Sequence, residues 1–165
     1  MANAPKICLW FDRDAEAAAE LYTRVLRDGS IGRTTRYLDP DPTPSKRPGE
    51  VMTVEFRAEG LEFVALNGGP EFTFSEAFSI QVYRDTQDEL DALADALLEG
   101  GGTQGPCGWL KDRFGMSWQV IPRELDELIA SDDEQVARAA TVAMLKMERI
   151  DLAELRRAAG VPTPA

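Results

Sequence analysis

The chain has 165 residues, of which 44% are hydrophobic and 28% are charged, a composition typical of a compact globular protein. Its 18 Lys and Arg residues and 29 Asp and Glu residues give a formal charge of −11. Duplex nucleic acids and anionic membrane surfaces are bound by clustered cations, so this charge argues against both as partners.

The sequence contains no histidine. Ser-His and Cys-His nucleophiles, imidazole general bases and most zinc or non-haem iron sites need that residue. An enzyme with this sequence would therefore rely on carboxylates, amides, thiols or hydroxyls. The two cysteines, Cys8 and Cys107, are too few for a disulfide scaffold, and we expect both to be small core residues.

Apolar stretches are all far shorter than the roughly 20 residues that a membrane-spanning helix needs. The first residues, MANAPK, lack the basic and apolar regions of a signal peptide. We therefore expect a cytoplasmic protein with no membrane segment.

The first half of the chain predicts a strand, a helix and three more strands. Lys6 to Phe11 is an apolar, aromatic-rich run typical of a strand, and Ala15 to Leu26 has the apolar spacing of a helix. A proline-rich loop and a hairpin turn at Gly60 separate the remaining strands. These strands are predicted over residues 30–38, 50–59 and 61–68.

The same order of elements recurs in the second half. Residues 78–83 predict a strand, and residues 85–98 an amphipathic helix that begins with a capping box formed by Thr86 and Glu89. A short segment ending at Pro106 and the strand-like runs CGWLKDRF and MSWQVIP follow. We therefore predict an α+β protein built from two βαβββ units, residues 1–69 and 70–122, related by internal duplication.

Residues 123–165 predict a C-terminal helical extension. Its middle helix carries an apolar stripe at helical spacing, which a short tail cannot bury alone. The stripe consists of Val136, Ala140, Ala143, Met144 and Met147. We expect it to pack on the two units or on another chain.

Four phrases that together span nearly the whole chain point to a known family: CLWFDRDAEAAAELYTRVL, GEVMTVEFRAEGLEFVALNGGPEFTFSEAFSIQV, GPCGWLKDRFGMSWQVIP and AMLKMERIDLAELRRAAG. They resemble the PhnB-like branch of the vicinal-oxygen-chelate superfamily, which includes glyoxalase I, extradiol dioxygenases and antibiotic-resistance proteins. This branch is often labelled demethylubiquinone 3-methyltransferase-like. No glycine-rich strand-to-helix turn of the kind associated with S-adenosylmethionine is readable here, so we do not expect methyl transfer.

The resemblance implies that the two units form a cupped mixed sheet, typically around a divalent metal. His or Gln near the first strand of each unit and Glu on the last strand usually hold that metal. In this sequence Ile7, Cys8, Ala65 and Gln119 stand near those positions. Because these groups cannot neutralise a divalent cation, we expect neither a metal nor another cofactor.

Polar side chains at the floor of the cup are the candidate ligand-binding groups. Gln81 and Gln119 are expected to donate and accept hydrogen bonds there, or else to face solvent as ordinary strand residues. Glu55 lies in a central strand, where it would be the best available general base if its face forms the cup, and a water-facing residue otherwise. If the cup is used, these three side chains should converge on one concavity.

All three tryptophans, Trp10, Trp109 and Trp118, lie on predicted strands. Each packs in the core or lines a ligand cavity, and we expect at least one on the wall of the cup. Strand alternation sends Trp118 and Gln119 to opposite faces, so only one of that pair can face the cup.

The resemblance thus predicts a protein that binds a small organic molecule. One alternative is lyase, isomerase or dioxygenase-type chemistry through an enolate-like or oxyanionic intermediate, and the other is non-catalytic binding or sequestration. Related proteins commonly cover their sheet edges by pairing two chains. We therefore expect a homodimer whose tail contacts the partner, with a tail that folds back on its own chain as the alternative.

The first prediction concerns metal content. Purified protein is expected to carry no stoichiometric zinc, nickel or iron, because the groups near the ligand positions of the family are uncharged and histidine is absent. Elemental analysis after extensive dialysis checks this, and a stoichiometric metal would contradict it.

Overall fold

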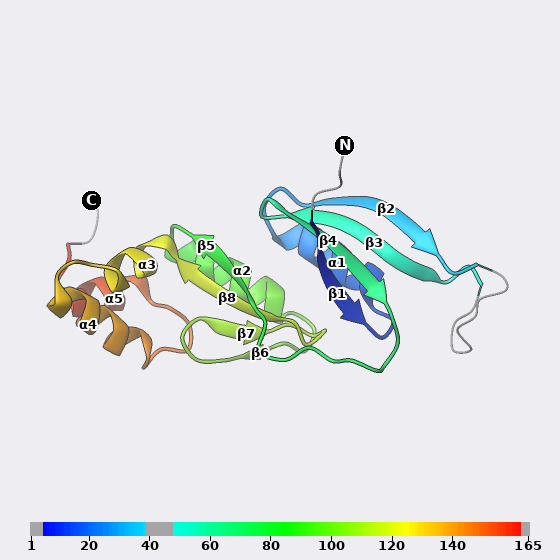
Figure 1. Cartoon of the computed structure of the whole chain (residues 1–165). Helices are drawn as coiled ribbons and strands as arrows, with labels where there is room; N and C mark the ends of the chain where they lie inside the picture. Colours follow the sequence, from blue (N-terminus) through cyan, green and yellow to red (C-terminus); the bar gives the residue numbers. More distant parts are fainter. Residues whose placement is uncertain (1–4, 39–47, 163–165) are drawn as a thin grey trace. The chain divides into compact units, whose positions relative to one another are not determined.

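The computed structural model describes residues 5–38 and 48–162 (Figure 1). The chain divides into two compact units, Met1–Phe74 and Ser75–Ala165. Most of the predicted proline-rich loop lies outside the described residues.

The first unit contains one helix and one four-stranded sheet. Its strands are ordered β1-β4-β3-β2; β1 and β4 are parallel, and the other neighbours are antiparallel. The elements are β1 (Ile7–Phe11), α1 (Ala15–Val25), β2 (Ser30–Arg36), β3 (Val51–Ala58) and β4 (Leu61–Asn67).

One face of this sheet is buried beneath α1, because side chains alternate between faces along each strand. The Tyr22 ring of α1 lies 5.9 Å from the Phe56 ring of β3. The buried strand residues of this face include Leu9, Phe11, Val54, Phe56, Ala58, Phe63 and Ala65. The intervening positions of the strands, among them Trp10 and Glu55, belong to the opposite face.

Asn67, at the end of β4, ties the sheet to the start of α1. Its Oδ1 accepts a hydrogen bond from the Ala15 backbone N–H at 2.9 Å, while its Nδ2 donates to the Val51 carbonyl at 3.1 Å. The Asp14 side chain makes no such cap. A buried amide from a distant strand therefore satisfies a backbone donor that the first helical turn leaves free.

The second unit repeats the arrangement. Its strands are ordered β5-β8-β7-β6 in the sheet. The strands that come first and last along the chain, β5 and β8, again pair in parallel. The elements are β5 (Ile80–Arg84), α2 (Gln87–Leu98), β6 (Thr103–Gln104), β7 (Trp109–Lys111) and β8 (Ser117–Pro122). The Thr86 half of the predicted capping box is confirmed, since Thr86 Oγ1 accepts from the Glu89 N–H at 3.3 Å, while Glu89 Oε2 accepts from the Asp85 N–H at 3.2 Å. The predicted duplicated α+β fold is confirmed as well.

Three helices follow β8: α3 (Arg123–Ile129), α4 (Glu134–Met144) and α5 (Leu152–Ala159). They pack around a shared core that includes Ile121, Leu125, Ile150 and Leu155. All five residues of the predicted stripe belong to this core or pack against it. The stripe therefore packs within its own unit, which is one of the two alternatives expected from the sequence, and the predicted homodimer stays a prediction.

No helix in the described part of the chain is both long and apolar enough to cross a membrane.

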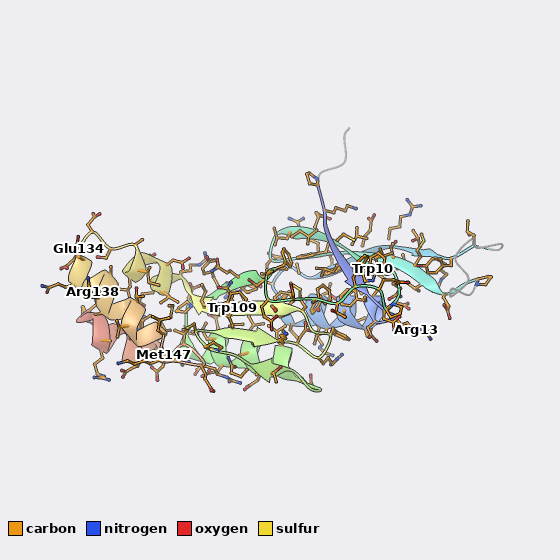
Figure 2. All side chains as sticks on the ribbon, turned by 60° about the horizontal axis from the view of Figure 1, so that its bottom comes forward. Trp10, Arg13, Trp109, Glu134, Arg138 and Met147 are labelled. Carbon is orange, nitrogen blue, oxygen red and sulfur yellow. The ribbon has the colours of Figure 1, made fainter. Side chains whose placement is uncertain are left out.

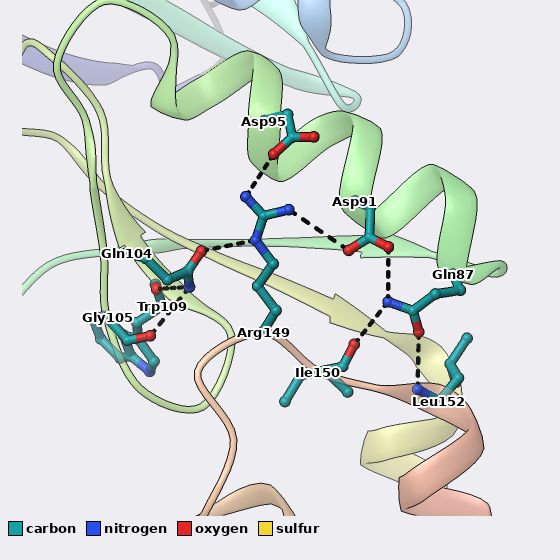
Figure 3. Close-up of polar contacts among 9 residues, drawn as sticks. All are labelled: Gln87, Asp91, Asp95, Gln104, Gly105, Trp109, Arg149, Ile150 and Leu152. Atoms are coloured by element: carbon teal, nitrogen blue, oxygen red, sulfur yellow. Dashed lines mark hydrogen bonds and ion pairs between the residues drawn. The ribbon is translucent and has the colours of Figure 1, made fainter.

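The tail is fastened to α2 and to the loop before β7 by polar contacts (Figure 3). Arg149 Nη2 lies 2.6 Å from Asp95 Oδ1 and its Nη1 lies 3.7 Å from Asp91 Oδ1, while its Nε donates to Gln104 Oε1 at 3.3 Å. Gln104 Nε2 in turn donates to the Trp109 carbonyl at 2.8 Å. The guanidinium thus connects the tail to the segment that leads into β7.

Backbone and amide contacts strengthen this attachment. The N–H groups of Cys107 and Gly108 donate to the carbonyls of Met147 and Glu148, both at 2.7 Å. Gln87 of α2 donates to the Ile150 carbonyl at 3.1 Å and accepts from the Leu152 N–H at 2.9 Å. The tail therefore braces the loop between β6 and β7.

This bracing predicts a local effect of Arg149→Met. Loss of its partly exposed ion pairs and of its bond to Gln104 should lower the free energy of opening of the loop by about 1 kcal/mol. This corresponds to about fivefold faster hydrogen exchange. Hydrogen exchange of the Gly105 and Cys107 amides measures the opening, with the exposed Arg138→Met as the control. Equal exchange in the two variants would contradict the bracing role.

Asp112 organises the turn between β7 and β8. The residue is 3% exposed, and its carboxylate accepts from the N–H groups of Phe114 at 2.9 Å, Met116 at 3.1 Å and the Trp118 indole at 2.9 Å. One carboxylate therefore fixes the turn and satisfies a buried indole at the same time.

Replacing Asp112 by Ala is expected to lower the free energy of unfolding by about 3 kcal/mol, because the buried Trp118 indole loses its acceptor. Chemical denaturation measures this loss. Asp132→Ala, at an exposed position of the tail, is the control and should change stability little. Similar stabilities of both variants would show that the turn does not depend on Asp112.

Candidate functional site

The second unit presents hydrogen-bonding side chains on the face of its sheet that α2 does not cover. Register places Gln81 of β5 opposite Gln119 of β8, and Trp109 of β7 on the other side of Gln119. The intervening residues Val82 and Val120 are buried on the face toward α2. We call the face that carries Gln81, Gln119 and Trp109 the open face of the second sheet.

A hydrogen-bonded row of neutral groups crosses this open face. Gln119 Nε2 donates to Ser79 Oγ at 2.8 Å, and Gln119 Oε1 accepts from Gln81 Nε2 at 3.0 Å. The Tyr83 hydroxyl lies 3.3 Å from Gln81 Oε1 and 2.7 Å from Asp126 Oδ2. The bond to the Asp126 carboxylate raises the pKa of Tyr83, which keeps its hydroxyl protonated.

A concavity of about 520 Å³ lies at the β6 and β7 side of this sheet, and of the residues on its wall Trp109 is the register partner of Gln119. It is lined by β6, β7 and the loop between them, together with Ser117 of β8 and Glu76. Trp109 is half-buried on its wall, and within the described residues no group accepts a hydrogen bond from its indole N–H. Trp109 therefore lines a concavity of the second unit, and the expectation that a tryptophan lies on the wall of the cup stays a prediction.

The other two tryptophans have their N–H groups satisfied by the protein. Trp118 is 1% exposed, lies on the face toward α2 and donates to Asp112. It shares no face with Gln119, as alternation predicted, so we assign it to the core and leave it out of the site. Trp10 Nε1 donates to the Gly69 carbonyl at 2.8 Å, and its ring packs edge-on against Phe72 at 5.0 Å.

Two of the predicted site residues belong to the first unit. Glu55 lies on the face opposite α1, where its carboxylate is 2.9 Å from Lys6 Nζ. Trp10 is on β1 of the same unit, and Trp109 is on β7 of the second (Figure 2). The convergence of Glu55 with Gln81 and Gln119 on one concavity stays a prediction.

Some residues of the open face are not singled out as site residues by the sequence. Tyr83 is two positions from Gln81 on one strand, a spacing that could have indicated a shared face. Lys111 resembles an ordinary turn charge in the sequence but lies on β7, and its Nζ is 2.5 Å from Glu76 Oε1. No pattern in the sequence distinguishes Ser117, whose surroundings depend on the pairing of β7 with β8.

A divalent metal does not fit the side chains at the positions that the family uses. In the first unit Ala65 is buried beneath α1, whereas Cys8 lies on the other face and is exposed, so the expectation that Cys8 is a core residue is wrong. In the second unit the corresponding strands carry Gln81 and Gln119, two neutral amides bonded to each other. Over residues 5–38 and 48–162, no group of three or more His, Cys, Asp or Glu could hold a metal ion.

Comparison with known proteins agrees with this architecture. The PhnB protein from Bacillus cereus is 27% identical, with a TM-score of 0.61 over 72% of this chain and 99% of that chain. Protein PA1353 from Pseudomonas aeruginosa is 21% identical and has the same fold, with a TM-score of 0.57 over 72% of this chain and 98% of that chain. No curated protein matches the chain significantly.

A family model described as 3-demethylubiquinone-9 3-methyltransferase matches residues 4–121, which is more than half of the chain. The matched segment contains both βαβββ units and ends within β8. The resemblance to PhnB-like proteins is thereby confirmed, and the chain belongs to the 3-demethylubiquinone-9 3-methyltransferase family.

Proposed function

We propose that the protein binds a small organic molecule on the open face of its second sheet, in the concavity beside Trp109. The observation that carries this proposal is the row of neutral hydrogen-bonding groups formed by Gln81 and Gln119, which the strand register places next to Trp109 on the wall of the concavity. A volume of about 520 Å³ suits a molecule of metabolite size.

Each side chain has a distinct role in the proposed binding. Trp109 offers a flat apolar surface on which a ring or chain of the ligand packs, and its N–H donates to a ligand acceptor. Each amide of Gln81 and Gln119 carries two donor hydrogens and an acceptor oxygen. The one bond between the two amides and their bonds with Ser79 and Tyr83 use only part of this capacity. The remaining capacity fixes the orientation of the ligand.

Binding without chemistry is the better supported of the two functional alternatives. The candidate base Glu55 is engaged in an ion pair with Lys6, and the raised pKa of Tyr83 disfavours its use as a base. The amides of the open face neither transfer protons readily nor form good nucleophiles. These observations favour a binding or sequestering protein over a lyase, isomerase or dioxygenase.

Methyl transfer, which the family name describes, has no counterpart among these residues. The connections between β1 and α1 and between β5 and α2, residues 12–14 and 85–86, contain no glycine. Glycine in such turns is what lets a backbone approach a nucleotide-like cofactor closely. We therefore propose no methyltransferase activity.

Ligand binding is tested by nuclear magnetic resonance on the ¹⁵N-labelled full-length protein. A set of small aromatic and aliphatic acids, alcohols, amides and amines is added at millimolar concentration. At least one compound should shift the Trp109 indole and the Gln119 side-chain amide, while the buried Trp118 indole stays unchanged. The Trp109 resonance is assigned by its loss in Trp109→Phe.

A pair of glutamine variants supplies the control. Gln119→Leu should weaken binding of the responding compound about fivefold because one hydrogen-bonding group is lost. Gln135→Leu, at an exposed position of α4, should bind like the unaltered protein. If no compound shifts the Trp109 indole, or if both variants bind equally, the proposed function is wrong.

A further inference from the structure

Ser117 carries a buried hydroxyl without a hydrogen-bond partner among the residues that the structure describes. The residue is 1% exposed and lines the concavity. Within residues 5–38 and 48–162 it is the only buried side-chain nitrogen or oxygen in this situation. Because buried polar groups are normally paired, an unpaired hydroxyl at the wall of a cavity points to a partner supplied from outside.

Lys111 is the cross-strand neighbour of Ser117. The two residues are register partners on β7 and β8, so their side chains leave the same face of the sheet. Lys111 and Glu76 are the only charged residues among those that line the concavity. The side chain of Lys111 is 36% exposed on its strand, whereas that of Glu76, on the segment before β5, is 65% exposed.

Because Lys111 is held on a strand, its ammonium is the charge that stays in place. The more exposed carboxylate of Glu76 is the group that can move away. The Lys111 ammonium lowers the pKa of Glu76, so Glu76 is ionised and occupies the place that an incoming anion would take. A cationic ligand would have to draw Glu76 away and would then face Lys111 itself. The concavity therefore favours a ligand with a negative group.

We propose that Ser117 and Lys111 form a carboxylate subsite, and that the ligand is a small aromatic acid whose ring packs on Trp109. This inference rests on the proposed ligand binding and adds the class of ligand. The carboxylate accepts a hydrogen bond from Ser117 Oγ and an ion-paired hydrogen bond from Lys111 Nζ, where it replaces Glu76. Trp109 and Lys111 are two positions apart on β7 and share its face, so one molecule can contact both.

Benzoate, benzyl alcohol and benzylamine test the inference, because they present one ring with a negative, a neutral and a positive group. The Trp109 indole resonance of the ¹⁵N-labelled full-length protein reports binding of each. Benzoate should bind about tenfold more tightly than either of the others, which is the effect of one charge-assisted hydrogen bond.

Variants of the subsite should change benzoate affinity in opposite directions. Lys111→Met should weaken it about tenfold and Ser117→Ala about fivefold, whereas Glu76→Gln should strengthen it about threefold by removing the competing carboxylate. Lys146→Met, an exposed lysine of the tail, is the matched control and should change nothing. Ser117→Ala should also keep the melting temperature or raise it, because it removes an unsatisfied hydroxyl.

The outcomes separate this inference from the function on which it rests. If benzyl alcohol or benzylamine shifts the Trp109 indole at least as strongly as benzoate, the concavity binds ligands but the carboxylate subsite is wrong. Weaker benzoate binding by Glu76→Gln also overturns the subsite. If none of the three probes shifts the Trp109 indole, the inference fails, and the proposed function then depends on the wider compound set alone.

Discussion

Parallel pairing of the first and last strands is the constraint on which each unit of this protein depends. To bring β4 beside β1, or β8 beside β5, the chain must cross one face of the sheet, and the crossing is made by a helix. That helix buries one set of alternate side chains. The other set, which includes Gln81 and Gln119, forms the surface on which the proposed ligand binding takes place.

Features that depend on local pattern could be predicted from the sequence. Apolar periodicity and the capping box of Thr86 and Glu89 are sufficient for the duplicated βαβββ order, because each is decided within one element. The covering of the tail stripe could not be predicted in this way. Residues such as Ile121 and Leu155 meet the stripe only after three helices have folded around it.

The candidate site likewise combines features that local sequence pattern predicts with features that depend on tertiary packing. Alternation correctly separates Trp118 from Gln119, since it needs only the strand assignment. The pairing of Lys111 with Ser117 depends on the register across a hairpin, and the buried state of the Ser117 hydroxyl depends on everything packed around it. Residue type and spacing predict neither property, so Lys111 and Ser117 could not be distinguished from ordinary strand residues in the sequence.

A crystal of the full-length protein soaked with sodium benzoate would show directly whether Ser117 and Lys111 hold a carboxylate. We expect the benzoate ring to lie against Trp109, with its carboxylate within hydrogen-bond distance of Ser117 Oγ and Lys111 Nζ and with Glu76 turned away. Ser117 Oγ bonded to a protein carbonyl, with benzoate absent from the concavity or bound elsewhere, would contradict it.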